Sequence, residues 1–288
     1  MKRFFKHIGL RIIITYILLV CLDLVFTYTL TKNSIIRNKI DYISNTQNNH
    51  FNSIFLGSSR VEYHVNTDLI DSITTTKSLN LGISGQSLSE TFLTFKLLVA
   101  NNIKAEKYFI QIDEKGLSEK KYKSFIGASS FMPYSKNEYV KEHLKKHDPD
   151  YYKDYYIPFY RYLNYGYKIG YREIVLKLSG KKRVEKFYIG LSETIQNKNA
   201  SYYFNNDYEI NLLNEIISFS KEKKLNIIFY TSPYYNPRNT VKFKGFCIKN
   251  NIVSYVDSIS SKDKFKDPEH LNHKGANEFT KQLIRDFY

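Results

Sequence analysis

The sequence predicts an α/β protein with a mostly parallel sheet, preceded by one apolar helix. Three observations lead to this prediction. One apolar run near the N-terminus is long enough to cross a bilayer, short strand-like runs alternate with helical patterns, and three of these runs stop at residues rich in glycine or serine. Strands separated by helices form βαβ units, and ligands of such sheets bind beyond the carboxyl ends of the strands.

The apolar run covers residues 12–30 and carries a single charge, Asp23. A membrane span needs about 20 mostly apolar residues, so this run is long enough. Four basic residues precede it and predict a cytoplasmic N-terminus: Lys2, Arg3, Lys6 and Arg11. A cleaved signal peptide is the main alternative, but no small-x-small site follows. We therefore expect residues 1–31 to be a cytoplasmic tip and an uncleaved single-pass anchor in a bacterial cytoplasmic membrane, with the remaining chain extracytoplasmic.

Asp23 is the one discordant residue of this anchor. A carboxylate at mid-membrane disfavours insertion by roughly 2.5–3.5 kcal/mol. Either the carboxyl group is protonated or it faces a partner helix.

The chain has 288 residues and a formal net charge of +15. Nucleic acid is the usual partner of so basic a protein, but an exported domain rarely meets DNA, so we expect no nucleic acid. Anionic lipid headgroups or acidic envelope glycans fit the charge better, and scattered lysines also serve solubility. The two cysteines exclude a disulfide scaffold.

The remaining elements follow in order along the chain. Residues 32–50 are polar and rich in asparagine, which is typical of a stalk. We expect one domain over residues 51–288, with strands at 53–56, 78–81, 107–112, 225–230 and 253–256, and helices at 87–100, 207–223 and 273–287. Asn272 is the expected N-cap of the last helix.

An insert of different composition interrupts this domain at about residues 117–205. Its segment 151–171 contains nine tyrosines and shows neither a helical nor a strand period. Tyrosine and arginine are common at binding surfaces, where aromatic rings suit sugars and arginine suits carboxylates or phosphates. Tyr160, Arg161 and Tyr162 are the candidates for substrate binding. A tyrosine-rich packing cap over the sheet is an equally supported interpretation.

Three residues have the chemistry of an activated nucleophile. Ser59 follows the first strand, and Asp267 and His270 lie three apart in the loop before the last helix. The carboxylate would orient the imidazole, which would take the serine proton. The backbone N–H groups of Ser59 and Gly85 are candidate oxyanion donors.

The same residues also have non-catalytic interpretations. Ser59 could simply be the cap of a helix that starts after the first strand. Asp267, His270 and His273 have a spacing that could suit a metal, but no fourth ligand is evident, so we expect neither metal nor cofactor. His64, like three other histidines, has no evident partner and is expected at the surface.

Three segments resemble conserved blocks I, II and V of the SGNH (GDSL-like) hydrolases. They are residues 55–60 (FLGSSR), 80–85 (NLGISG) and 267–276 (DPEHLNHKGA). The resemblance covers roughly residues 51–116 and 205–288. It implies a flavodoxin-like three-layer sandwich, with Ser59 as nucleophile, His270 as base, Asp267 as its orienting partner and Gly85 as an oxyanion donor.

The chain departs from the family pattern at two places. Ser58 stands where the family has aspartate, and the asparagine of block III is absent because the third strand runs into residues 112–116 (IDEKG). A lost oxyanion donor raises the barrier to acyl transfer by roughly 3–4 kcal/mol. A backbone amide or Arg60 is a candidate substitute, and Arg60 is also a candidate for substrate binding.

Such departures are typical of the membrane-anchored SGNH-like proteins that handle acyl groups on envelope polymers, and this chain is most similar to that branch. The resemblance implies a serine acyl esterase or O-acyltransferase that acts on cell-surface polysaccharide. The partners implied are a glycan or acyl donor, the membrane through the N-terminal helix, and a membrane-embedded acyltransferase. The alternative is a non-catalytic glycan-binding or scaffold protein of polysaccharide assembly with the same fold.

Overall fold

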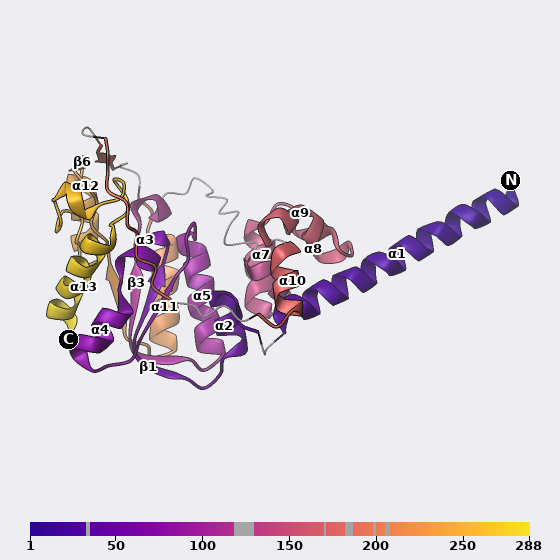
Figure 1. Ribbon diagram of the computed structural model, residues 1–288, viewed down its shortest axis with the longest axis horizontal. Helices are drawn as coiled ribbons and strands as arrows, with labels where there is room; N and C mark the ends of the chain where they lie inside the picture. Colours follow the sequence, from indigo (N-terminus) through magenta and orange to yellow (C-terminus); the bar gives the residue numbers. More distant parts are fainter. Residues whose placement is uncertain (33–34, 118–129, 170, 182–186, 198–199, 205–207) are drawn as a thin grey trace. The chain divides into compact units, whose positions relative to one another are not determined.

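The computed structural model describes the whole chain except residues 33–34, 118–129, 170, 182–186, 198–199 and 205–207 (Figure 1). The chain forms two compact units. The first, here called the anchor unit, comprises residues 1–45 and 128–184, and the second, the sheet unit, comprises residues 46–127 and 185–288.

The sheet unit is built on a four-stranded parallel sheet in the order β2-β1-β3-β5. Its strands are β1 (His50–Gly57), β2 (Ser78–Gly82), β3 (Lys104–Gln111) and β5 (Ile227–Tyr230). Phe55 of β1 pairs with Asn80 on one side and Phe109 on the other. Ile54, Phe55 and Leu56 are all buried, as expected for a central strand covered on both faces. The α/β class and the parallel sheet are confirmed.

Helices cover both faces of this sheet, so the unit has three layers (Figure 1). The helices α3 (Ser59–His64), α4 (Thr67–Thr74) and α13 (His273–Phe287) pack together on one side, and α5 (Leu88–Ala100) and α11 (Asn211–Glu222) on the other. The remaining described elements of the unit are α12 (Val241–Lys249), the short strands β4 (Tyr202–Tyr203) and β6 (Pro237–Arg238), and 3-10 turns at Glu114–Leu117 and Lys262–Lys264.

Most predicted elements of the sheet unit are present with small shifts at their ends. Asn272 caps α13 as predicted, because its side chain accepts the N–H groups of Lys274 and Gly275. The predicted fifth strand is wrong, since a single parallel bridge joins Val253 to Tyr230. Helices α3, α4 and α12 were not predicted, because each is too short to show a clear apolar period.

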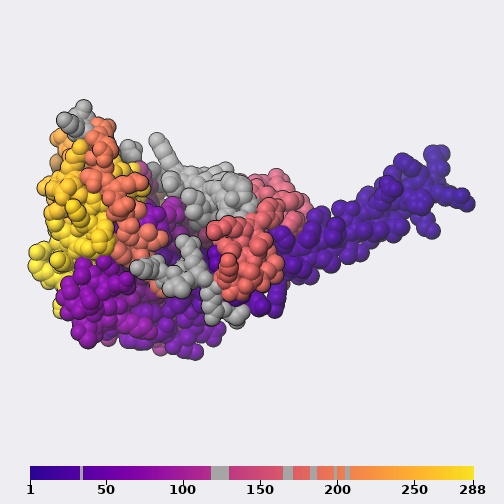
Figure 2. Space-filling view, in the orientation of Figure 1, coloured from indigo at the N-terminus to yellow at the C-terminus, as the bar shows by residue number. Residues whose placement is uncertain are grey.

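The anchor unit is helical in its described parts. It contains α1 (Lys2–Thr31), α2 (Lys39–Asn45), a 3-10 turn at Met132–Tyr134, and α7 (Glu138–His147), α8 (Tyr151–Tyr156), α9 (Tyr160–Ile169) and α10 (Tyr171–Leu178). The helix α1 is long and apolar enough to cross a membrane. In Figure 2 its first half carries no cover from other described side chains.

Two expectations for this part of the chain need correction. The predicted stalk contains α2, whose Ile40 and Ile43 are fully buried. The tyrosine-rich segment is helical, with the ring of Tyr152 stacked on that of Tyr156 at 6.2 Å. Its period was hidden because tyrosine occupies both the buried face of α8, at Tyr151, and the exposed face, at Tyr152. Residues 128–184 of the predicted insert also group with the first 45 residues and not with the sheet.

Gly82 at the end of β2 lets α3 approach the sheet closely. A Cβ atom at this position would lie 2.3 Å from the backbone nitrogen of Glu62 and 2.6 Å from the Cβ of Val61. Since backbone atoms cannot yield as a flexible side chain does, we expect Gly82→Ala to lower the free energy of unfolding by about 1–3 kcal/mol. Urea unfolding of the full chain in detergent, followed by circular dichroism, measures this change.

Gly245 within α12 is the matched control, because a Cβ there meets no atom within 4 Å. We expect Gly245→Ala to raise stability by about 0.5–1 kcal/mol through helix propensity. Equal stability of the Gly82→Ala variant and the wild type would contradict the close packing of α3 on β2.

Candidate functional site

The turn between β1 and α3 presents Ser59 at the carboxyl edge of the sheet. Gly57 has φ +155°, and a Cβ there would lie 2.6 Å from Val61 and 2.9 Å from Gln111. Ser58 is the N-cap of α3 and accepts the N–H of Arg60. Strand, glycine and cap therefore turn the chain sharply, and Ser59 becomes the first residue of the helix.

Ser59, His270 and Asp267 form a continuous hydrogen-bonded series. Ser59 Oγ lies 2.8 Å from His270 Nε2, and His270 Nδ1 lies 2.9 Å and 3.0 Å from the two oxygens of Asp267. The carboxylate can only accept, so Nδ1 carries a proton toward it and Nε2 is free to accept the serine hydroxyl. The structure thus brings the three predicted residues together, from the two ends of the sheet unit.

Asp267 is held as an anion next to the imidazole. Burial would raise its pKa, but the hydrogen bond and the charge of His270 hold the pKa below its ordinary value. The backbone N–H groups of Glu269 and His270 also donate to Asp267 Oδ1, at 2.8 Å and 2.9 Å. A carboxylate fixed in this way orients the ring and would stabilise a positive charge on it.

Backbone donors for an oxyanion lie at the start of α3. Among the described residues the Ser59 N–H has no acceptor, so it is available to a ligand. Gly85, at φ +75°, lies in the turn after β2, where the N–H of its neighbour Ser84 donates to Glu62 of α3 at 3.1 Å. This turn is tied to the helix that carries Ser59, and the donor role of Gly85 stays a prediction.

Arg60 does not bind substrate as predicted, because its guanidinium is buried. It donates to Asp113 at 2.7 Å and to the carbonyls of Ser232 and Pro233 at 2.6 Å and 2.8 Å. Its carbon Cζ lies 3.5 Å from the ring centre of Tyr234. With 2% of its surface exposed, Arg60 positions the turn that carries Ser59 and has no face left for a ligand.

Asp113, after β3, is the main residue of the site that the sequence did not single out. Its carboxylate accepts hydrogen bonds from Ser58 at 2.5 Å, Arg60 at 2.7 Å and Gln111 at 2.8 Å. Burial would raise the pKa of Asp113, but Arg60 and the hydrogen bonds outweigh burial and hold it below its ordinary value. The sequence did contain a signal for Asp113. It is an acidic residue directly after the third predicted strand, where block III of the SGNH hydrolases has its asparagine.

The other predicted substrate-binding residues belong to the other compact unit. Arg161 and Tyr162 belong to the anchor unit, where both are buried and hydrogen-bonded to Thr27 of α1, so their predicted substrate-binding role is wrong. Tyr160 of the same helix lies beside Lys153, with 6.0 Å between the ammonium and the ring centre.

His64 was expected at the surface but is fully buried. Its Nε2 accepts the backbone N–H of Leu271 at 3.0 Å, next to the loop that carries Asp267 and His270. Burial lowers the pKa of His64 well below its ordinary value, and the neighbouring Arg60 and His270 add to this. A neutral imidazole is required here, since only an unprotonated nitrogen can accept the Leu271 N–H.

His273, the third residue of the spacing that could suit a metal, has other partners. His273 Nδ1 lies 3.0 Å from the hydroxyl of Tyr188, and its Nε2 lies 3.1 Å from Asn277. Within the described residues no group of three or more His, Cys, Asp or Glu side chains could hold a metal ion.

No protein-family model matches the chain, and no curated protein matches it. Several solved structures are similar to it, and two are described here. A protein described as lipolytic and of the G-D-S-L family, from Desulfitobacterium hafniense DCB-2, has a TM-score of 0.38 and 10% identity, over 81% of this chain and 97% of its own. A protein described as a platelet activating factor, from Streptococcus pneumonia, has a TM-score of 0.33 and 12% identity, over 98% of this chain and 99% of its own. These are loose likenesses, and the assignment of the site rests on its own side chains.

The ion pair between the buried Arg60 and the partly exposed Asp113 leads to a prediction about stability. Asp113→Ala leaves the guanidinium buried without a counter-charge, so we expect the free energy of unfolding to fall by about 3 kcal/mol. Because the pKa of Asp113 is held below its ordinary value, the wild-type pair stabilises the fold at neutral pH. This contribution is lost as the pH falls through the folded-state pKa, so the difference between wild type and variant shrinks in acid. Urea titrations at several pH values measure it.

Lys115 provides the control for this charge removal. Its ammonium lies 2.7 Å from Glu269, and both side chains are exposed. We expect Lys115→Ala to change stability by less than about 1 kcal/mol. If Asp113→Ala lowers the free energy of unfolding no more than Lys115→Ala does, the ion pair of Arg60 and Asp113 does not stabilise the turn.

Proposed function

We propose that the chain is a membrane-anchored serine acyl esterase or O-acyltransferase of the SGNH type, acting on a cell-surface polysaccharide. One observation carries the catalytic part of this proposal. Asp267, His270 and Ser59 are joined by hydrogen bonds of 2.8–3.0 Å at the carboxyl edge of a parallel sheet. This arrangement has the three roles that acyl transfer needs: a nucleophile, a base, and a group that orients the base.

The first half of the reaction forms an acyl-serine. Ser59 Oγ attacks the carbonyl carbon of an ester while His270 Nε2 takes the hydroxyl proton. The Ser59 N–H donates to the carbonyl oxygen as it gains negative charge. The bond to the alcohol oxygen then breaks, and His270 returns the proton to the departing alcohol. Asp267 stays ionised throughout and stabilises the imidazolium.

The second half differs from the first only in the acceptor. Water or a sugar hydroxyl attacks the acyl-serine, and its proton passes through His270 to Ser59 Oγ as the ester bond to the enzyme breaks. Water yields hydrolysis, and a sugar hydroxyl yields transfer. The side chain of His270 is about one-quarter exposed, so an acceptor can reach its Nε2 edge from solvent.

Different observations support the other parts of the proposal. The length and hydropathy of α1 support membrane anchoring. The net charge of +15 and the three SGNH-like segments support an acidic envelope polymer as substrate. Tyr162 and Arg161 add nothing to this support, because they pack against α1.

A non-catalytic role as a glycan-binding or scaffold protein has one observation in its favour. The end of β3 carries the carboxylate of Asp113, which is fully engaged with Ser58, Arg60 and Gln111, and no amide donor lies in its place. One fewer oxyanion donor would slow acyl transfer, whereas glycan binding would not need it.

Labelling with a serine-directed fluorophosphonate tests the catalytic role. We expect an adduct on the full chain in detergent, none on Ser59→Ala, and labelling slowed about 10²–10⁴-fold on His270→Ala, because the base no longer removes the hydroxyl proton. Mass spectrometry of the labelled peptide identifies the modified serine.

Ser72 of α4 is the control, because its hydroxyl is exposed and bonds only to Leu69 among the described residues. Ser72→Ala must label as the wild type does. A folded wild type without adduct would favour the non-catalytic role. An adduct on Ser59→Ala would refute Ser59 as the nucleophile.

A further inference from the structure

One face of α1 is covered by Phe159, in the turn before α9, and by the helices α9 and α10. Leu19, Leu22 and Phe26 pack against a cluster formed by Phe159, Tyr162, Ile174 and Leu30. These positions of α1 recur every three to four residues, so they form a single stripe along the helix. The contact begins at Leu19 and continues to the end of α1, where the ammonium of Lys177 donates to the carbonyl of Leu30.

Asp23 lies on this stripe and has its partner within the chain. Its carboxylate accepts hydrogen bonds from the guanidinium of Arg161 at 2.5 Å and from the backbone N–H of Phe159 at 3.0 Å. Arg161 also donates to Thr27 at 2.9 Å and to Ser135 at 2.7 Å. The anomalous carboxylate of the apolar run is thus explained without a helix from another protein.

Because only a short part of α1 is free of the insert helices, the contact between them cannot lie far outside a membrane that α1 spans. The apolar part that is free of the insert, residues 12–18, is only about 10 Å long at the helical rise of about 1.5 Å per residue. Even residues 2–18 span about 25 Å, less than the hydrocarbon thickness of about 30 Å, and they include four basic residues. A spanning α1 therefore needs residues 19–30 within the bilayer, together with the insert helices attached to them.

The exposed side chains of the insert helices suit such a position. On α10 the exposed apolar or aromatic residues Tyr171, Val175 and Leu178 recur at i, i+4 and i+7, with 57%, 62% and 68% of their surfaces exposed, and Arg172 is exposed beside them. Ile174 and the polar Lys177 are buried on the opposite side. A water-facing helix has the reverse distribution. Further exposed apolar or aromatic side chains on α8, α9 and the turn between them are Tyr152, Tyr156, Ile157 and Leu163.

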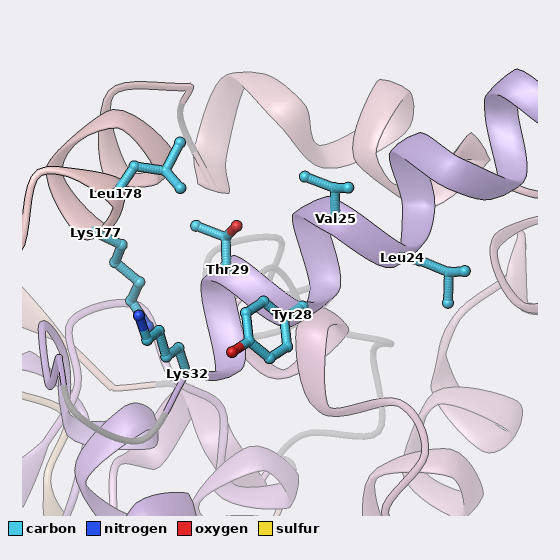
Figure 3. A pocket seen from close by; sticks show the side chains of 7 residues that line it. All are labelled: Leu24, Val25, Tyr28, Thr29, Lys32, Lys177 and Leu178. Atoms are coloured by element: carbon cyan, nitrogen blue, oxygen red, sulfur yellow. The ribbon is translucent and has the colours of Figure 1, made fainter.

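The exposed apolar surface of α1 continues into that of α10. A pocket of about 440 Å³ lies between the two helices, lined by Leu24, Val25, Tyr28, Thr29, Lys32, Lys177 and Leu178 (Figure 3). Its walls are largely apolar, and two lysines lie toward the end of α1. Lys177 is buried and engaged by Asp41, whereas Lys32 lies at the rim. A hydrocarbon chain fits such a wall, and Lys32 can meet an anionic headgroup.

We propose that α8, α9 and α10 lie in the outer leaflet of the membrane beside α1, with their exposed apolar side chains in contact with lipid. This inference rests on the membrane anchoring in the proposed function. The turn between α8 and α9 lies deepest, because Phe159 is bonded to Asp23, whereas Leu178 lies near the headgroups, next to the end of α1. Tyrosines at such an interface have their rings in the apolar layer and their hydroxyls at the headgroups.

Tryptophan fluorescence tests this placement directly, because the chain has no tryptophan of its own. The full chain is reconstituted in phosphatidylcholine and phosphatidylglycerol vesicles with lipids brominated at different depths of the acyl chain. We expect Ile157→Trp and Leu178→Trp to show quenched emission, shifted to shorter wavelength. Ile157→Trp is quenched most by deeply placed bromines and Leu178→Trp by shallow ones. All replaced residues are exposed, so the fold tolerates them, and thermal unfolding checks this.

Two control variants separate this proposal from the anchoring itself. Leu18→Trp lies on the uncovered part of α1 and is quenched whenever α1 enters the bilayer, while Tyr203→Trp, on the exposed strand β4, stays unquenched. Quenching of Leu18→Trp without quenching at residues 157 and 178 would overturn the proposal and assign this face to water or a protein partner. No quenching at residue 18 would overturn the anchoring as well.

Discussion

The guanidinium of Arg60 joins the carboxyl ends of three parallel strands. Arg60 itself follows β1, its ion-pair partner Asp113 follows β3, and the two carbonyls that it reaches, of Ser232 and Pro233, follow β5. A buried guanidinium needs a counter-charge and acceptors, which Asp113 and the two carbonyls supply to its two terminal nitrogens. The three strand ends therefore have to stay within hydrogen-bond reach of it. Ser59 is the residue immediately before Arg60, and its position relative to His270 therefore depends on this one buried charge.

The anchor unit depends on a second guanidinium in a similar way. Arg161 satisfies Asp23, the only charge in the apolar run of α1, and binds Thr27 one helical turn later. Breaking a buried pair is strongly destabilising, because the remaining charge has no solvent to replace its partner. The attachment of the insert to α1 thus has a fixed register along the helix, which a purely apolar contact between Phe26 and its neighbours would not impose.

Much of the sheet unit could be predicted because its signals are local. Strand-like runs, the N-cap at Asn272 and the order of Ser59, Asp267 and His270 can all be read from neighbouring residues. In a parallel sheet the strand ends meet at one edge, so the convergence of the three residues followed from topology. The pairing of Asp23 with Arg161 joins residues 138 positions apart and left no local pattern. The predicted substrate-binding role of Arg60 was wrong for the same reason. Tyr234, which covers the guanidinium, is far from Arg60 in the sequence, so the segment 55–60 alone does not reveal that Arg60 is buried.

Ser58 and Asp113 form a donor and acceptor pair, and this pairing connects the two departures from the family pattern. The hydroxyl of Ser58 donates to Asp113 at 2.5 Å, so a carboxylate at position 58 would place two like charges within hydrogen-bond distance. The negative charge next to Ser59 is instead located at the end of β3, where it also neutralises Arg60. Asparagine at that strand end could not neutralise the guanidinium. The site thus has a carboxylate where the family has an amide donor, and this carboxylate ties the end of β3 to the turn at Ser59. In the proposed reaction an oxyanion would therefore depend on backbone N–H groups.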